Sequence, residues 1–172
     1  MQTVFYDDVP TPLGTMVGAA TQTHLVLLEF ADRPMLAKDL DRIGKRFACE
    51  CGPGDSPVLH ALRSQLDEFF GGTRREFDIP LRARGTAFQE RVWQELLTIP
   101  VGSTTTYSAI AASIGRPTAV RAMAAANGDN PIAILIPCHR VIGSNGTLTG
   151  YGGGLWRKRR LLDLEKGAGA LS

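Results

Sequence analysis

No run of about 18 apolar residues occurs in this sequence, so no segment has the length and hydropathy of a membrane-spanning helix. Residues 1–14 contain no basic stretch followed by an apolar run, and a secretory signal peptide is therefore not expected. Cysteine is scarce: there are three, and an odd number without a secretory signal predicts reduced thiols rather than disulfides. Together these absences predict a cytoplasmic protein.

Charge of one sign is not in large excess, since the net charge is +2, but its distribution along the chain is uneven. Residues 1–81 carry 8 basic and 12 acidic side chains, whereas residues 82–172 carry 11 and 5. We predict two domains with these bounds, and the basic second half favours an anionic partner, nucleic acid above all. Chance clustering of solvated charges would explain the same asymmetry.

The first half is expected to be a small α/β domain with an antiparallel sheet. Short β-branched runs separated by Pro, Gly and Thr predict strands, and the second and third are close enough to form a hairpin. Two apolar patterns of helical spacing predict helices, the second of them capped by Ser56. The expected strands are 3–9, 14–20, 23–30 and 75–81, and the expected helices are 35–47 and 56–72.

A zinc site in the first half is a weaker alternative. Its candidate ligands are His24, Cys49, Cys51 and His60. The two cysteines are separated by one residue rather than two to four, and no second close pair follows. Ordinary core or surface positions explain these residues better, although zinc stays open.

The second half is expected to be mostly helical. Thr86 caps a helix over 87–100, whose apolar residues Phe88, Val92, Trp93, Leu96 and Leu97 share one side and predict core packing. Two short helices joined by a tight turn follow and predict a helix-turn-helix. Beyond them the sequence predicts an extended apolar segment over 131–137, a glycine-rich loop over 143–154 and a final amphipathic helix from 155.

The second helix of that predicted helix-turn-helix has almost no side chains that could read bases. Between Thr118 and Ala126 the one long polar group is Arg121, and the rest are small or apolar. Reading bases in the major groove requires Arg, Lys, Asn or Gln. Small residues such as Ala119 and Ala122 instead permit close approach to the minor groove, where one arginine could hold open a gap in the base stack. A packed alanine-rich helix with one exposed arginine is the simpler alternative.

Residues 134–143, ILIPCHRVIG, place a thiol and an imidazole directly after a large aliphatic run. A thiolate is a strong nucleophile, and a nearby base promotes its formation. Because neighbours on an extended chain point to opposite faces, a direct hydrogen bond between Cys138 and His139 is not expected, and a water could bridge them. A carboxylate should orient the base. The candidates in the second half are Glu90, Glu95, Asp129, Asp163 and Glu165, of which Glu165 lies on the final helix.

The segment NPIAILIPCHRVIGSNGTLTGYGGGLWRKRRLLDLE resembles the active-site region of the O6-alkylguanine-DNA alkyltransferases, the methylated-DNA–protein-cysteine methyltransferases. The resemblance extends over residues 80–167, and the first half resembles the family's N-terminal α/β domain in size and strand pattern. It implies single-use transfer of an alkyl group from O6-alkylguanine in duplex DNA to the protein's own cysteine. O4-alkylthymine is a second candidate substrate. No metal or organic cofactor is needed, because the alkyl carbon is already activated on the substrate.

The resemblance also implies roles for individual residues. Cys138 would be the acceptor, His139 would take the thiol proton through a water, and Glu165 would hold His139. Asn130 would tie the active-site turn to the helix-turn-helix. Tyr107 would rotate the nucleotide and donate a hydrogen bond to the flipped base, and Arg121 would fill the vacated stack.

Further residues of the resemblance belong to the base pocket and the DNA contact. A backbone N–H near Tyr151 and Gly152 would donate to the base oxygen, and carbonyls near Cys138 and Val141 would accept from the base amine. Gly152 is serine in some relatives, so the size of the accepted alkyl group stays open. The remaining implied contacts are Lys158 near the pocket and Thr118, Ala119 and Ala122 on the DNA; Arg140 is expected to pair inside the protein.

The expected partner is double-stranded DNA containing O6-alkylguanine. We expect a monomer in solution, and cooperative binding along DNA stays open. Three alternatives compete with this interpretation: a non-catalytic binder of alkylated DNA, a thiol hydrolase or peptidase using Cys138 and His139, and a transcriptional regulator. The first alternative would bind the same alkylated DNA as an alkyltransferase, but it is disfavoured because Cys138 is present.

Overall fold

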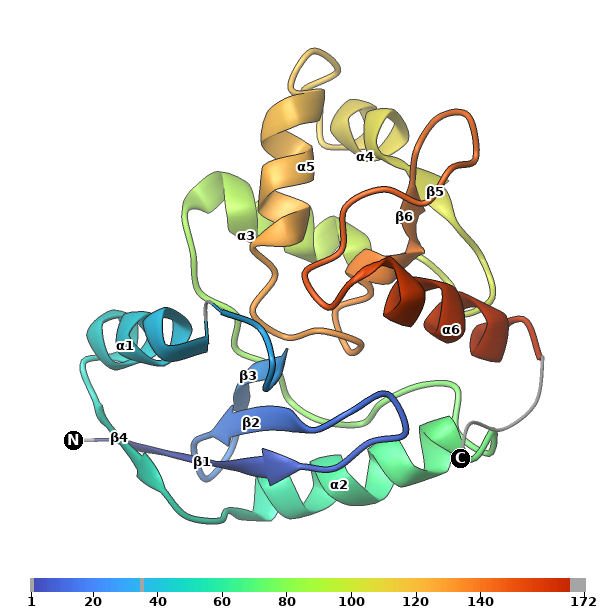
Figure 1. The fold of residues 1–172 in the computed structure, drawn as a ribbon. Helices are drawn as coiled ribbons and strands as arrows, with labels where there is room; N and C mark the ends of the chain where they lie inside the picture. The colour runs from blue at the N-terminus through green and yellow to red at the C-terminus, as the bar shows by residue number, and fades with distance from the viewer. Residues whose placement is uncertain (1, 35, 168–172) are drawn as a thin grey trace. The chain divides into compact units, whose positions relative to one another are not determined.

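The computed structural model describes residues 2–34 and 36–167, which form two compact units (Figure 1). In the sequence the boundary between the units falls between Arg84 and Gly85. Within the described ranges, no helix is both long and apolar enough to cross a membrane. Each unit is described by itself below.

The first unit is built on a four-stranded sheet of order β3-β2-β1-β4. The strands are β1 (Thr3–Val9), β2 (Met16–Ala20), β3 (Leu25–Phe30) and β4 (Glu50–Pro53). The hairpin between β2 and β3 is confirmed, and β1 also pairs antiparallel with β2. The expectation of a purely antiparallel sheet is wrong, because β4, which was not predicted, pairs parallel with β1. The helix α1 (Leu36–Phe47) precedes β4 and carries the chain back to the start of β1, as a parallel neighbour requires.

Helices α1 and α2 (Pro57–Phe70) cover opposite faces of this sheet. Successive strand residues face opposite sides, and the neighbours Gly18 and Ala19 illustrate this. Gly18 lies against Leu59 and Leu62 of α2, whereas Ala19 belongs to an apolar cluster with Ile43 of α1. The predicted cap of α2 is confirmed: the Ser56 hydroxyl accepts a hydrogen bond from the Leu59 N–H at 3.2 Å.

The strand predicted over 75–81 is absent apart from a single bridge between Leu25 and Leu81. The backbone of this segment bonds largely to side chains instead of a neighbouring strand. Gln65 accepts from the Asp78 N–H at 2.9 Å and donates to the Asp78 carbonyl at 3.3 Å. These bonds follow the surface of α2 and satisfy groups that a β-ladder would otherwise pair.

The second unit contains the helices α3 (Ala87–Leu96), α4 (Tyr107–Ser113), α5 (Val120–Gly128) and α6 (Leu155–Glu165). Thr86 caps α3 as predicted, in a capping box with Gln89. The predicted core side of α3 is confirmed for Val92, Trp93 and Leu96, and the Trp93 indole donates to the Ala126 carbonyl of α5 at 2.8 Å. Leu97 does not belong to that core: it follows the helix end and is 46% exposed.

Two details of the second unit differ from the predictions. The second short helix starts at Val120, so Thr118 and Ala119 lie in the turn before it. Residues 131–137 form turns rather than an extended segment, and Ile134 has a φ of 72°. The extended pairing lies just beyond them, where β6 (Val141–Ile142) pairs parallel with β5 (Thr105–Thr106). This small ladder places the residues after Cys138 beside the start of α4.

Candidate active site

Cys138 begins a single-turn 3₁₀ helix, η1 (Cys138–Arg140), and its residue is only 7% exposed. The backbone is held on both sides of the thiol: the Cys138 N–H donates to the Ile136 carbonyl and the Arg140 N–H to the Pro137 carbonyl. The premise of an extended chain at this point is therefore wrong. A tight helical turn, which sequence reasoning missed, presents the thiol within the unit's core.

A buried hydrogen-bonded row connects His139, Glu165 and Arg140. The Nε2 of His139 lies 2.9 Å from Oε1 of Glu165, and the two side chains are 0% and 1% exposed. Arg140 donates from Nε and Nη2 to the same carboxylate, and from Nη1 to the Ile99 carbonyl at 2.8 Å. Of the carboxylates that the sequence left open, Glu165 is the one the fold brings to His139, and the expected internal pairing of Arg140 is confirmed.

The charges of this row follow from burial and hydrogen bonding. Burial lowers the pKa of His139 more than the hydrogen bond to Glu165 raises it, so the imidazole is neutral near pH 7. Burial alone would raise the pKa of Glu165, but the hydrogen bonds from His139 and Arg140 outweigh it and hold the pKa at about 2. The carboxylate is thus ionised and accepts a hydrogen from Nε2, which leaves Nδ1 of His139 as a bare acceptor. Nδ1 is buried and has no hydrogen-bond partner among the described residues.

Two asparagines hold the turn that carries Cys138. Asn130 donates from Nδ2 to the Ile136 carbonyl at 2.8 Å and accepts from the Ile132 N–H at 3.0 Å, so it closes the loop before the thiol. Asn127, in the last turn of α5, donates from Nδ2 to the Cys138 carbonyl at 3.4 Å. Asn127 was not among the predicted site residues. Its position in the sequence NGDNP, next to the predicted Asn130, was the available signal.

Lys158 is fully buried and points at backbone carbonyls. Its ammonium donates to the Val141 carbonyl at 2.6 Å and to the Thr149 carbonyl at 2.8 Å. Burial lowers its pKa to about 8. The Tyr107 hydroxyl donates to the same Thr149 carbonyl at 2.8 Å. These bonds join α4, α6 and β6 to the glycine-rich loop that was predicted to wall the pocket.

The residues predicted to contact DNA lie on α5 and its preceding turn. Arg121, Thr118 and Ala122 are exposed, and Ala119 is half-buried at the helix N-terminus. In the glycine-rich loop Tyr151 is half-buried and Gly152 is exposed. Burial raises the pKa of Tyr107, which keeps its hydroxyl protonated and able to donate.

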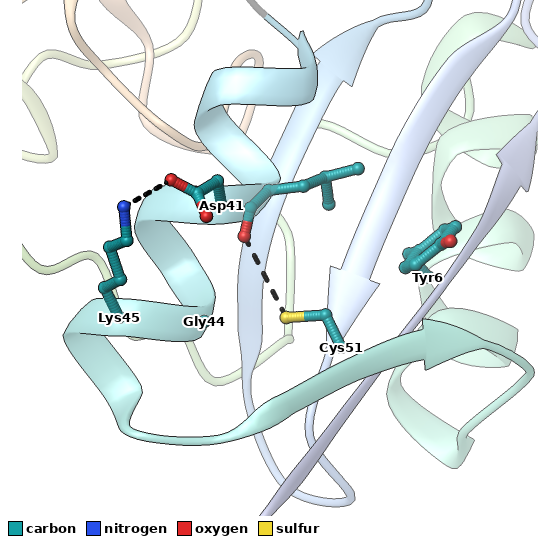
Figure 2. Close-up of a pocket in the computed structure, with 6 residues that line it drawn as sticks. Tyr6, Asp41, Gly44, Lys45 and Cys51 are labelled. Atoms are coloured by element: carbon teal, nitrogen blue, oxygen red, sulfur yellow. Dashed lines mark hydrogen bonds and ion pairs between the residues drawn. The ribbon is translucent and has the colours of Figure 1, made fainter.

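Of the other two cysteines, Cys51 lines an open pocket in the first unit. Its volume is about 360 Å³, and Figure 2 shows Cys51 of β4 facing the Leu40 carbonyl of α1, with Lys45 paired to Asp41. Burial, with the nearby Cys49 thiol, raises the pKa of Cys51 to about 11. The thiol therefore stays protonated near pH 7 and is a weak nucleophile. Among the described residues no group of three or more His, Cys, Asp or Glu side chains could hold a metal ion.

Known family models match both halves of the chain. Residues 4–83 match the ribonuclease-like domain of 6-O-methylguanine DNA methyltransferase, and residues 87–167 match its DNA-binding domain. Together the two models span almost the whole sequence.

Individual relatives agree with this match. A methylated-DNA–protein-cysteine methyltransferase of Mycobacterium bovis is 62% identical over 166 residues, which cover 95% of this chain and 93% of the relative. One from Methanosarcina barkeri is 42% identical, with 95% and 98% covered. A crystal structure of Mycobacterium tuberculosis OGT in complex with DNA superposes with a TM-score of 0.82 and 43% identity, covering 96% of this chain and 95% of the other. The chain belongs to the 6-O-methylguanine DNA methyltransferase family.

Proposed function

We propose that this protein repairs DNA by moving the alkyl group of O6-alkylguanine in a duplex onto Cys138, once per molecule. The observation that carries the assignment is the buried row beside the thiol: a neutral imidazole, His139, held by an ionised carboxylate, Glu165. A neutral imidazole oriented by a carboxylate is the arrangement that takes a proton from a nucleophile. Membership of the family supports the choice of Cys138 as the proton donor and of alkyl transfer as the reaction.

The transfer balances without any cofactor. The Cys138 thiol gives its proton, through one water, to Nδ1 of His139, and Glu165 stabilises the resulting imidazolium. The sulfur attacks the alkyl carbon, a carbon–sulfur bond forms, and the carbon–O6 bond breaks with its electron pair leaving on the guanine. The guanine then takes a proton and returns to its ordinary form. The thioether on Cys138 is not reversed, so each molecule reacts once.

The helices α4 and α5 act in this proposal as a helix-turn-helix that lies in the minor groove. The exposed Thr118 and Ala122 are small enough for close approach, with Ala119 at the start of the helix. Arg121 enters the stack in place of the flipped nucleotide. Sequence preference is small, since α5 offers little that could read bases.

The flipped base enters a pocket between Cys138 and the glycine-rich loop. An N–H near Tyr151 and Gly152 donates to the base oxygen and makes guanine a better leaving group. Carbonyls at Cys138 and Val141 accept from the base amine, and Lys158 holds the Val141 carbonyl in place. Tyr107 rotates the nucleotide and donates to the base, after releasing the Thr149 carbonyl that it binds here.

The remaining parts of the proposal concern organisation. Residues 82–172 are the DNA-binding and alkyl-acceptor domain, and residues 1–81 are the N-terminal α/β domain. The protein works in the cytoplasm and is a monomer in solution.

A transfer assay with a duplex carrying one O6-methylguanine, isotopically labelled in the methyl group, tests the assignment. Cys138→Ser should bind the duplex as the wild type does but take up no label, because a serine hydroxyl is a far weaker nucleophile than a thiolate. The matched control is Cys49→Ser/Cys51→Ser, which should retain full uptake. Label on Cys138→Ser, or loss of uptake in the control alone, would contradict the proposal.

A further inference from the structure

Asn127 is a buried polar residue with an unused hydrogen-bond acceptor. It lies in the last turn of α5 and is 3% exposed. Its Nδ2 donates to the Cys138 carbonyl, while its Oδ1 is buried and has no hydrogen-bond partner among the described residues. Leaving an amide oxygen buried without a hydrogen-bond donor costs free energy. Such atoms are rare in native proteins, and each calls for an explanation such as a bound water or a functional role.

A second buried acceptor without a hydrogen-bond partner among the described residues belongs to the residue that follows Cys138. It is Nδ1 of His139, the ring nitrogen left bare because Nε2 carries the hydrogen toward Glu165. Both residues adjoin Cys138: His139 follows it in η1, and Asn127 donates to its backbone carbonyl. Both unpartnered atoms therefore belong to residues that adjoin the residue carrying the reacting sulfur.

Two acceptors cannot satisfy each other, so they need a group that carries two hydrogens. A water molecule donates two hydrogen bonds and accepts up to two more, and buried waters typically bond to two to four polar atoms. A water that donates to Nδ1 of His139 and to Oδ1 of Asn127 still has a lone pair for the thiol hydrogen of Cys138. The three groups together account for both of the water's hydrogens and one of its two lone pairs.

We propose that Asn127 is a positioning residue that orients the water which passes the thiol proton of Cys138 to His139. The inference rests on the proposed function and adds a residue to its proton path. During transfer the sulfur–hydrogen bond breaks, and the water takes that hydrogen while it gives one of its own to Nδ1 of His139. The water's other hydrogen stays on the water, hydrogen-bonded to Oδ1 of Asn127. The amide neither gains nor loses a proton, but it fixes which hydrogen of the water faces the imidazole.

The test compares Asn127→Leu with the wild type and with Met123→Leu, a fully buried control on the same helix. The probe is free O6-benzylguanine, whose reaction needs no DNA contact, and the readout is the transfer rate against pH. The wild-type rate should be nearly flat around neutral pH, because His139 is already neutral there. Asn127→Leu should be slower by about tenfold or more at neutral pH, in line with the loss of positioned proton transfer. Its rate should rise between about pH 7 and 8, where solvent supplies more of the thiolate while Lys158 still carries its proton.

The shape of the pH profile separates positioning from packing. Met123→Leu should keep the wild-type shape, and Asn127→Asp, which retains an acceptor oxygen, should recover a flatter profile than Asn127→Leu. An Asn127→Leu profile identical in shape to the wild type would overturn the inference. If Asn127→Leu does not fold, a crystal structure of the wild type decides: a water bonded to both Oδ1 of Asn127 and Nδ1 of His139 supports the inference, and its absence overturns it. A wild type that transfers no alkyl group would instead refute the proposed function itself.

Discussion

Replacing Glu165 by glutamine tests how the buried row beside Cys138 is held together. The substitution keeps the shape of the side chain but removes the negative charge between His139 and Arg140. The pKa of Glu165 is about 2 in the fold against an ordinary 4.5, and this difference corresponds to about 3 kcal/mol of stabilisation of the charged form. Removing one partner of a buried ion pair costs about 3–5 kcal/mol in other proteins, because the remaining charge is left uncompensated. We expect Glu165→Gln to lower the free energy of unfolding by about that amount.

Urea unfolding near neutral pH measures this loss. The matched control is Glu90→Gln, an exposed carboxylate in the same unit that accepts from the Gly85 N–H, and it should change stability by less than about 0.5 kcal/mol. A second variant, Glu165→Gln/Arg140→Met, should recover part of the lost stability, because it also removes the Arg140 guanidinium that Glu165→Gln leaves buried without a carboxylate partner. This recovery separates charge from packing.

The pH dependence of the same measurement gives an independent check. Because the folded pKa of Glu165 is depressed, its contribution is complete above about pH 4.5 and is lost as the pH falls toward 2. The wild type should therefore lose stability over that acid range more steeply than Glu165→Gln. The reasoning would be refuted if Glu165→Gln lowered the free energy of unfolding by less than about 1 kcal/mol and showed the same decrease in stability at acid pH as the wild type. Such a result would mean that Glu165 is not an ionised, buried carboxylate.

Three further substitutions test other parts of the account. Arg121→Ala should slow repair of a methylated duplex by about tenfold or more while leaving the reaction with free O6-benzylguanine nearly unchanged; equal losses would argue against a stack-filling arginine. The wild-type transfer rate should fall above about pH 8, where Lys158 loses its proton. The Lys158→Met variant should be slower at every pH and should lack that fall. A wild-type rate that keeps rising above about pH 8 would contradict a role for the Lys158 ammonium in holding the Val141 and Thr149 carbonyls. Burial raises the pKa of Glu29 to about 7 despite its ion pair with Arg33, so the folded state holds this proton more tightly than the unfolded one. Urea unfolding should show the wild type losing up to about 3 kcal/mol between pH 4.5 and 7 and Glu29→Gln losing less; parallel curves would contradict this.

Much of the fold could be read from local patterns. Caps at Ser56 and Thr86 and apolar spacing fixed the starts of α2 and α3. The strand β4 could not be found in the same way, because ECGP has neither alternation nor β-branched residues and is a strand only through its pairing with β1. The prediction of an extended segment over 131–137 was wrong although the pattern was there. Its aliphatic run is buried, as in a strand, but Asn130 bonds to its backbone and holds it in turns.

In the candidate active site, too, the sequence predicted the kinds of residue present better than their arrangement. The sequence offered the residue types, a thiol beside an imidazole and several carboxylates, and the family resemblance selected Glu165. The geometry of η1 was not accessible, because a one-turn helix after a proline leaves no periodic pattern. Asn127 escaped for a related reason, since its importance depends on where the end of α5 meets the Cys138 carbonyl.

The central claim is that Cys138 takes the alkyl group and keeps it. Intact-protein mass after mixing with a duplex that carries one O6-methylguanine tests it most directly. The account predicts a gain of one methyl group in place of a hydrogen, located on Cys138 by peptide mapping and limited to one per molecule. An unchanged mass, with or without a tight complex, or a methyl group on any other residue, would contradict it.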